Sequence, residues 1–149
     1  MPAPAAPPFI RDVIGIDVDA LLVDWRWRIP PRQTPLFVTM LADFIFGAPD
    51  GRIWLLSSLE GDYREIARTG AEWNASKSSE KWLKGTLHMD FYLVALQNGL
   101  VPQRRQCIGW KLHPRLGGPL EAANLQIFSA QAYCSLTGKL HEQLSTTQE

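Results

Sequence analysis

Three histidines and two cysteines are the side chains of this sequence best suited to metal binding or nucleophilic chemistry: His88, His113, His141, Cys107 and Cys134. Metal sites usually place their ligands at short spacings such as CxxC or HxxxH, and no pair here has one. Neither cysteine has a directly adjacent cationic residue that would lower its thiol pKa, so we expect two small buried hydrophobic residues. The sequence therefore predicts no metal-binding residue and no cofactor.

Other residue combinations only partly match catalytic motifs. Ser78 precedes Lys81 by the spacing of a Ser–Lys acylase, but the companion SDN and KTG motifs are missing. We therefore assign no catalytic residue. An alternative is a small enzyme or ligand-binding domain with His88, Asp90 and His113 around one pocket, which requires these three side chains to converge in the fold.

The stretch "GWKLHPRLGG", residues 109–118, combines several functional side chains with three glycines. A phosphate-binding loop would lead from its glycines into a helix, whereas here Pro119 follows and a capped helix starts only about ten residues later. The glycines are typical of a turn after a strand. Because His113 precedes Pro114, its backbone should be extended, which would project its ring and the Arg115 side chain from the turn.

Composition limits the classes of partner. The 149 residues include 15 basic and 15 acidic side chains, so no net field attracts nucleic acid or an anionic membrane. The N-terminal "MPAPAAPPF" has neither the basic start nor the apolar centre of a signal peptide, and no apolar run is long enough to span a bilayer. We expect a reduced, cytoplasmic protein without a membrane or direct nucleic-acid partner.

Hydrophobic periodicity and turn residues predict the elements along the chain. Tyr133, Leu136, Leu140 and Leu144 should form the inner stripe of the last helix. The expected elements are a helix over 17–27, strands over 36–46 and 52–59 joined by the "APDG" turn, a weaker strand over 63–67, a short helix capped by Thr69, a long helix from about Ser79 to Asn98, strands over 106–112 and 124–128 around a loop, and a final helix capped by Ser129.

This order of elements is typical of the α+β class, with an antiparallel sheet of about four to five strands packed against about three to four helices. A chain of this length forms one domain. We expect a mobile Pro/Ala-rich tail over 1–16, a single domain over 17–145 and a short tail over 146–149.

A set of residues forms one pattern in the later part of the chain: Cys107, Gly109, Pro114, Leu116, Gly117, Gly118, Asn124, Gly138 and His141. With this pattern the chain resembles the C-terminal domain of type VI secretion immunity proteins that protect against Tde-type DNase effectors. The similarity runs from about residue 17 to 145 and is most specific after residue 100. It implies a bacterial, cytoplasmic, non-enzymatic protein that binds and silences a cognate toxin.

A toxin-blocking surface needs a few aromatic or arginine anchors. We expect Trp27, Trp110, His113 and Arg115 to contact the partner, because the glycine-built scaffold does not require their side chains. A regulatory interaction domain unrelated to toxins is the remaining alternative. An adjacent gene for a secreted nuclease would favour immunity.

Overall fold

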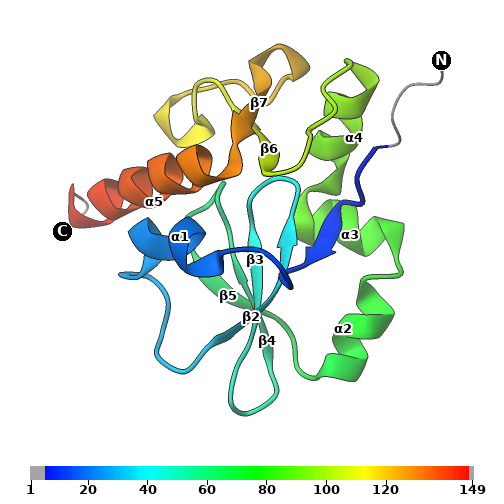
Figure 1. Ribbon diagram of the computed structural model, residues 1–149, viewed down its shortest axis with the longest axis vertical. Helices are drawn as coiled ribbons and strands as arrows, with labels where there is room; N and C mark the ends of the chain where they lie inside the picture. The colour runs from blue at the N-terminus through cyan, green and yellow to red at the C-terminus, as the bar shows by residue number, and fades with distance from the viewer. Residues whose placement is uncertain (1–5, 148–149) are drawn as a thin grey trace.

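The computed structural model describes residues 6–147, and the fold is α+β, as the sequence predicts. Its centre is a five-stranded antiparallel meander in the order β1-β2-β3-β4-β5, next to a separate two-stranded antiparallel sheet of β6 and β7 (Figure 1). The strands are β1 (Ile10–Asp12), β2 (Thr34–Thr39), β3 (Phe44–Gly47), β4 (Ile53–Leu56), β5 (Tyr63–Ala67), β6 (Gln106–Trp110) and β7 (Leu125–Ser129).

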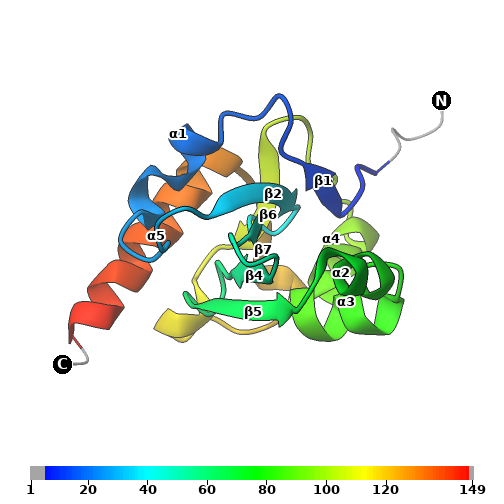
Figure 2. The ribbon, with the colours of Figure 1, turned by 90° about the horizontal axis from the view of Figure 1, so that it is seen from below.

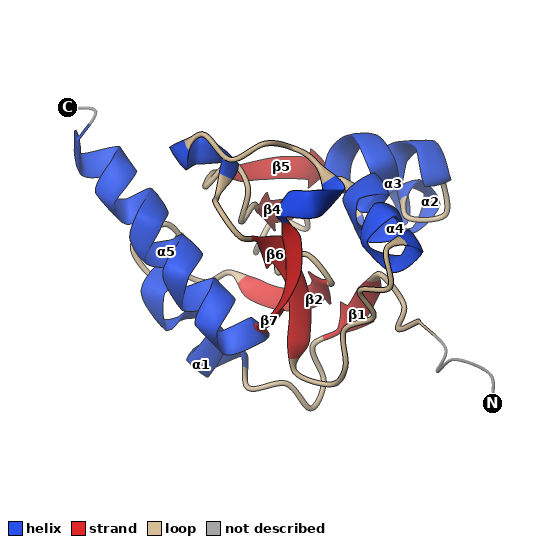
Figure 3. Cartoon of the chain, turned by 90° about the horizontal axis from the view of Figure 1, so that it is seen from above, coloured by secondary structure: helices blue, strands red, loops and turns tan. Residues whose placement is uncertain are grey.

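The helices form two groups on either side of the sheets (Figure 2). One group follows β5, and the other consists of α1, its 3-10 extension and the long α5, which pack together. Figure 3 shows α5 and α1 on one side of the strands and α2, α3 and α4 on the other. The helices are α1 (Val18–Leu22), α2 (Gly70–Ser76), α3 (Glu80–Leu87), α4 (Met89–Gln97) and α5 (Ala130–Thr147), and the 3-10 turns are η1 (Val23–Trp25), η2 (Pro114–Leu116) and η3 (Ala122–Asn124).

Each helix group covers its own hydrophobic cluster. The cluster beside α2, α3 and α4 includes Ile45, Leu55, Trp73, Leu87 and Tyr92. The cluster beside α1 and α5 includes Leu22, Trp25, Phe44, Phe46 and Tyr133. Full burial of one large apolar side chain contributes about 2 kcal/mol, so these two clusters fix both helix groups against the strands. Among the described residues, no helix is both long enough and apolar enough to cross a membrane.

The predicted strand over 36–46 is two strands, β2 and β3, separated by a tight buried turn. The Thr39 hydroxyl accepts hydrogen bonds from the N–H groups of Leu41 and Asp43, and Ala42 has a φ of 63°. A left-handed alanine is uncommon, and nothing in its residue type announces a turn. The prediction was wrong at this point because Met40, Leu41 and Ala42 continue the apolar run of the strands, and the single Asp43 did not mark a turn.

The predicted long helix is also two helices. His88 ends α3 with a φ of 58°, its N–H donating to the Leu83 carbonyl, and α4 begins at the next residue. The hydrophobic periodicity continues across the break, and no glycine or proline marks it. The expected stop at the end of α4 is confirmed, since Gly99 has a φ of 79°.

The N-terminal boundary lies earlier than the sequence predicts. β1 pairs with β2, and Phe9 is buried in the core, so the second half of the predicted tail 1–16 belongs to the domain. Residues 1–5 lie outside the part of the chain that the structure describes. At the other end α5 continues to Thr147, beyond the predicted start of the tail at residue 146.

The inner face of α5 differs from the predicted leucine stripe. Tyr133 is buried as expected, but Leu136 is 59% exposed, and Leu140 and Leu144 are only half-buried. The helix lies so close to the backbone of η1 that only narrow side chains fit at the contact. The buried face consists of Tyr133, Cys134, Thr137, Gly138 and His141.

Candidate functional site

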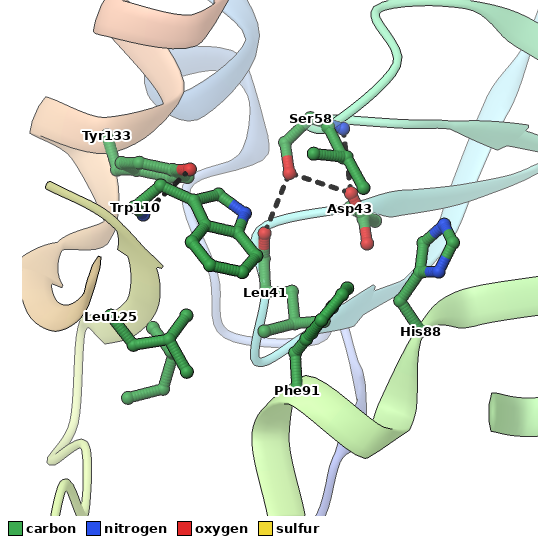
Figure 4. A pocket seen from close by; sticks show the side chains of 10 residues that line it. Leu41, Asp43, Ser58, His88, Phe91, Trp110, Leu125 and Tyr133 are labelled. Carbon is green, nitrogen blue, oxygen red and sulfur yellow. Dashed lines mark hydrogen bonds between the residues drawn. The ribbon is translucent and has the colours of Figure 1, made fainter. Parts of the chain in front are cut away.

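Asp43 is the centre of a buried polar network in the turn between β2 and β3 (Figure 4). Its Oδ1 accepts hydrogen bonds from the N–H of Ser58 at 2.7 Å and from the Ser58 hydroxyl at 2.8 Å. The Thr39 hydroxyl lies 3.4 Å from Oδ2. The Ser58 hydroxyl is also 2.9 Å from the carbonyl of Leu41, so its single proton has two acceptors within reach. The network ties the β2–β3 turn to the end of β4.

Burial is the main influence on the carboxyl group of Asp43. It raises the pKa of Asp43 to about 6, while the hydrogen bonds from Ser58 and Thr39 and the nearby His88 act in the opposite direction. Hydrogen bonds to a carboxylate stabilise its charged form, whereas removal from water destabilises that form. The carboxyl group is therefore mainly ionised at neutral pH and takes up a proton in mild acid.

His113 and His141, the histidine pair, meet at one main-chain carbonyl. The Nε2 atoms of both rings lie 2.9 Å from the oxygen of Ser58, and the ring planes are nearly perpendicular, at 82°. A carbonyl oxygen only accepts hydrogen bonds and has two lone pairs, so each ring must carry its proton on Nε2. Nδ1 of His113 accepts a bond from the N–H of Arg115 at 3.1 Å, which fixes the same tautomer.

Both rings of the histidine pair are neutral at pH 7. Burial is the largest effect and lowers the pKa of His113, and it lowers the pKa of His141 to about 4. The bond to the Ser58 carbonyl opposes this shift, while the Arg115 charge adds to it. A proton added to Nδ1 of His113 would remove the acceptor that the Arg115 N–H uses.

The network contains serine, histidine and aspartate, but not in the arrangement of a nucleophilic triad. In such a triad a histidine nitrogen accepts the proton of the serine hydroxyl, and the carboxylate orients the histidine. Here both imidazoles bond to the main-chain oxygen of Ser58, and its hydroxyl points to Asp43 and the Leu41 carbonyl. These groups hold the backbone in place.

A small cavity adjoins the network. Its volume is about 10 Å³, and Asp43, Ser58, His88 and Trp110 are among the lining residues. This is roughly the space that one water molecule needs, so no substrate fits. His88 Nε2 lies 3.4 Å from a carboxylate oxygen of Glu60, which is within the distance of an ion pair. The nitrogen nevertheless makes no hydrogen bond there.

The predicted pocket of His88, Asp90 and His113 does not form in the structure. His88 lines the cavity, whereas Asp90 is exposed on α4 and His113 bonds to the Ser58 carbonyl outside the cavity lining. The residues that accompany His88 are Asp43 and Glu60 instead. Sequence spacing could not indicate them, because Asp43 lies on a different element.

The chain between β6 and β7 forms a compact loop, residues 111–120, which we call the leucine loop. The Asn124 side chain closes it: Nδ2 donates to the carbonyls of Leu112 and Pro119 at 2.8 and 3.0 Å, and Oδ1 accepts from the N–H of Leu112. A Cβ on Gly118 would lie 1.8 Å from the Leu112 oxygen, so only glycine allows this approach. His113 holds the loop to the body of the domain.

Three leucines of this loop face solvent. Leu112, Leu116 and Leu120 are 47%, 55% and 58% exposed. Arg115 is exposed between them and reaches the carbonyl of Glu60 at 3.3 Å. The surface position of these leucines was not predicted from the sequence. Their four-residue spacing was the available signal, but it is equally typical of residues that pack inward.

The four predicted partner-binding residues separate into buried and accessible ones. Trp110 and His113 are each only 7% exposed, so the fold turns both side chains inward, and their contact with a partner stays a prediction. Trp27 is half-buried, stacked on Trp25 at 6.2 Å between ring centroids. Arg115 is exposed. The glycine scaffold turns His113 inward to the Ser58 carbonyl, and Trp110 packs on Phe91.

Metal-binding side chains do not gather in the structure. Within residues 6–147, no group of three or more His, Cys, Asp or Glu side chains is placed to hold a metal ion. Cys107 and Cys134 are buried free thiols, which confirms the expectation that they are buried. Burial raises the pKa of both thiols, that of Cys134 to about 12, and both stay protonated at neutral pH.

An open hollow of about 370 Å³ lies at the far end of the sheet. Its floor is the Trp54–Tyr63 pair, whose rings stack with centroids 5.4 Å apart. The Tyr63 hydroxyl donates to Gln33, which braces the neighbouring loop. Asp50, which also lines the hollow, is paired with Arg52 at 3.2 Å.

Comparison with known proteins identifies a fold relative. No protein-family model and no curated protein sequence matches the chain. A solved structure, described as the crystal structure of Atu4351 from Agrobacterium tumefaciens, superposes with a TM-score of 0.63 at 14% sequence identity. The match covers 88% of this chain and 66% of the other, so the chain spans about two thirds of that protein. At this identity the likeness concerns the fold alone.

Proposed function

We propose that this chain is a non-enzymatic, cytoplasmic immunity protein that binds and inhibits a cognate secreted toxin, a DNase effector of type VI secretion. The resemblance to such proteins, which runs from about residue 17 to 145, supports this function. The structure adds one observation that carries the proposal: the polar side chains suited to chemistry anchor a rigid loop that exposes apolar side chains.

The anchoring is what a binding surface requires. A loop that is already ordered loses little conformational entropy when a partner binds, which leaves more of the interaction energy for affinity. Exposure to water is unfavourable for apolar side chains such as those of Leu112, Leu116 and Leu120. Several exposed apolar side chains on one loop are typical of an interaction site. An enzyme would instead need an accessible cleft beside its reactive groups, and the cavity at Asp43 has room for about one water molecule.

Three of the residues that carry the resemblance help to hold the leucine loop to the domain. Asn124 closes the leucine loop, Gly118 allows its backbone to approach, and His141 shares the Ser58 carbonyl with the loop residue His113.

The proposal is tested by co-expression with the nuclease encoded beside the gene for this chain. We expect growth rescue of cells that express the active toxin, and co-purification of a stable complex when the toxin is catalytically inactivated. The purified chain should also block DNA cleavage in vitro. Rescue without a complex would contradict inhibition by binding, and the absence of any adjacent toxin gene would favour a regulatory domain unrelated to toxins.

A further inference from the structure

We infer that the leucine loop is the surface that contacts the toxin, and that it enters an apolar groove edged by carboxylates on that partner. This inference rests on the proposed function and identifies the contact chemistry. It is carried by the exposure of the loop leucines, the sign of the charge between them and the hydrogen bonds that hold the loop.

The apolar part of the surface comes from three side chains on one short segment. Leu112, Leu116 and Leu120 are each about half exposed. The carbonyls of Leu112 and Pro119 share the Nδ2 group of Asn124, so the two ends of the loop lie side by side. An apolar groove on the partner would remove exposed leucine side chains of this loop from water, and buried side chains at the centre of an interface usually dominate its affinity.

The positive charge of the loop indicates that negatively charged side chains line the edge of that groove. Residues 111–120 include Lys111 and Arg115 but no Asp or Glu, and His113 is neutral at pH 7. The Arg115 guanidinium makes one long bond, 3.3 Å, to the carbonyl of Glu60, which leaves its other N–H groups available. Opposite charge on the partner would orient the encounter.

Nucleases contain both signs of charge. Their DNA-binding surfaces are basic and would repel this loop. Their divalent metal ions are held by carboxylates, so negative side chains are concentrated where the metal binds. A cationic, apolar loop therefore matches an acidic groove of the toxin.

The test measures binding of the purified chain to the catalytically inactivated toxin by calorimetry. Leu116→Asp and Leu120→Asp should each raise the dissociation constant by about 30-fold or more, because each variant would place a carboxylate in an apolar groove edged by carboxylates. Leu136→Asp is the matched control: Leu136 is 59% exposed on α5, and its replacement should change affinity less than about twofold. Thermal denaturation of each variant verifies that the fold is intact.

The charge component is tested separately. Arg115→Glu should weaken binding by about tenfold, mainly through a slower association rate, and should reduce the salt dependence of that rate. Arg104→Glu, an exposed arginine outside the loop, should leave the affinity unchanged. If Arg115→Glu binds as tightly as the parent chain at all salt concentrations, the carboxylate-edged groove is ruled out.

The outcomes separate the two proposals. If the parent chain neither rescues growth nor binds the toxin, the proposed function fails and this inference fails with it. If the parent chain binds and the Leu116 and Leu120 variants bind equally well, the toxin contacts another surface and only this inference is overturned. An equal loss for Leu136→Asp would place the contact on α5 and would also overturn it.

Discussion

Replacement of Asp43 by asparagine should change how the stability of the domain depends on pH. Asp43 is buried, and its pKa is raised from 3.8 to about 6. A carboxyl group that binds its proton more tightly in the folded state stabilises the fold below its unfolded pKa, and this contribution is lost as pH rises through the folded value. The asparagine side chain has nearly the same size as that of aspartate but does not titrate.

The magnitude follows from the two pKa values. Over the whole window, from below 3.8 to above 6, the proton linkage of Asp43 corresponds to about 3 kcal/mol. Between about pH 5 and pH 8 the change is on the order of 1 kcal/mol. The free energy of unfolding of Asp43→Asn minus that of the parent chain should therefore be on the order of 1 kcal/mol more positive at the higher pH.

The assay is urea unfolding of both chains at the two pH values, followed by tryptophan fluorescence and circular dichroism. Titration of the histidine pair occurs in both chains and largely cancels in the difference. Coincident transitions and equal denaturant slopes are the controls, since they show that the same two-state unfolding is compared. A difference that does not change with pH would refute the claim that burial controls the carboxyl group of Asp43.

Three further predictions concern the contacts that hold the leucine loop, which are made by Asn124 and the histidine pair. The imidazole of His141 should titrate by NMR with a midpoint near its pKa of about 4. Its contribution to the free energy of unfolding should be lost as the pH falls from the ordinary value of 6.5 to about 4. A midpoint above 6.5 would contradict its neutral, buried state. Gly61→Ala should destabilise the domain by about 3 kcal/mol in thermal unfolding, because Gly61 has a φ of 76° and the added Cβ would lie 2.2 Å from the His141 ring. Gly51→Ala is the control: Gly51 has a φ of 90° but open space around it, so this substitution should destabilise the domain by only about 1 to 2 kcal/mol. Asn124→Ala removes bonds to two carbonyls and one N–H, so it should cost about 2 to 3 kcal/mol and accelerate hydrogen exchange in the loop; unchanged exchange would show that Asn124 does not hold it.

Local signals in the sequence were sufficient for most elements. The Thr69 and Ser79 side chains accept bonds from the N–H groups three residues later, as their positions before helices predict. The "APDG" turn joins β3 to β4, and the weak strand over 63–67 is β5. Such features depend on residues within one turn of chain, which is why pattern and residue type identify them.

The ends of strands and helices that lie inside apolar runs could not be predicted from such local signals. The β2–β3 turn depends on Thr39 and on a left-handed Ala42, and the break between α3 and α4 depends on a left-handed His88. These residue types do not by themselves require a positive φ. The surrounding contacts impose the conformation, and the apolar pattern continues through it.

The sequence by itself determined the α+β class, most strands and helices, and the glycine-built turn that became the leucine loop. Only the tertiary structure decided which side chains of that loop face inward. His113 and His141 reach the Ser58 carbonyl from positions 55 and 83 residues away along the chain, and no local pattern encodes contacts of that separation. Once His113 is drawn inward, Arg115 and the leucines of the loop remain at the surface, because the same backbone cannot turn both sets toward the core.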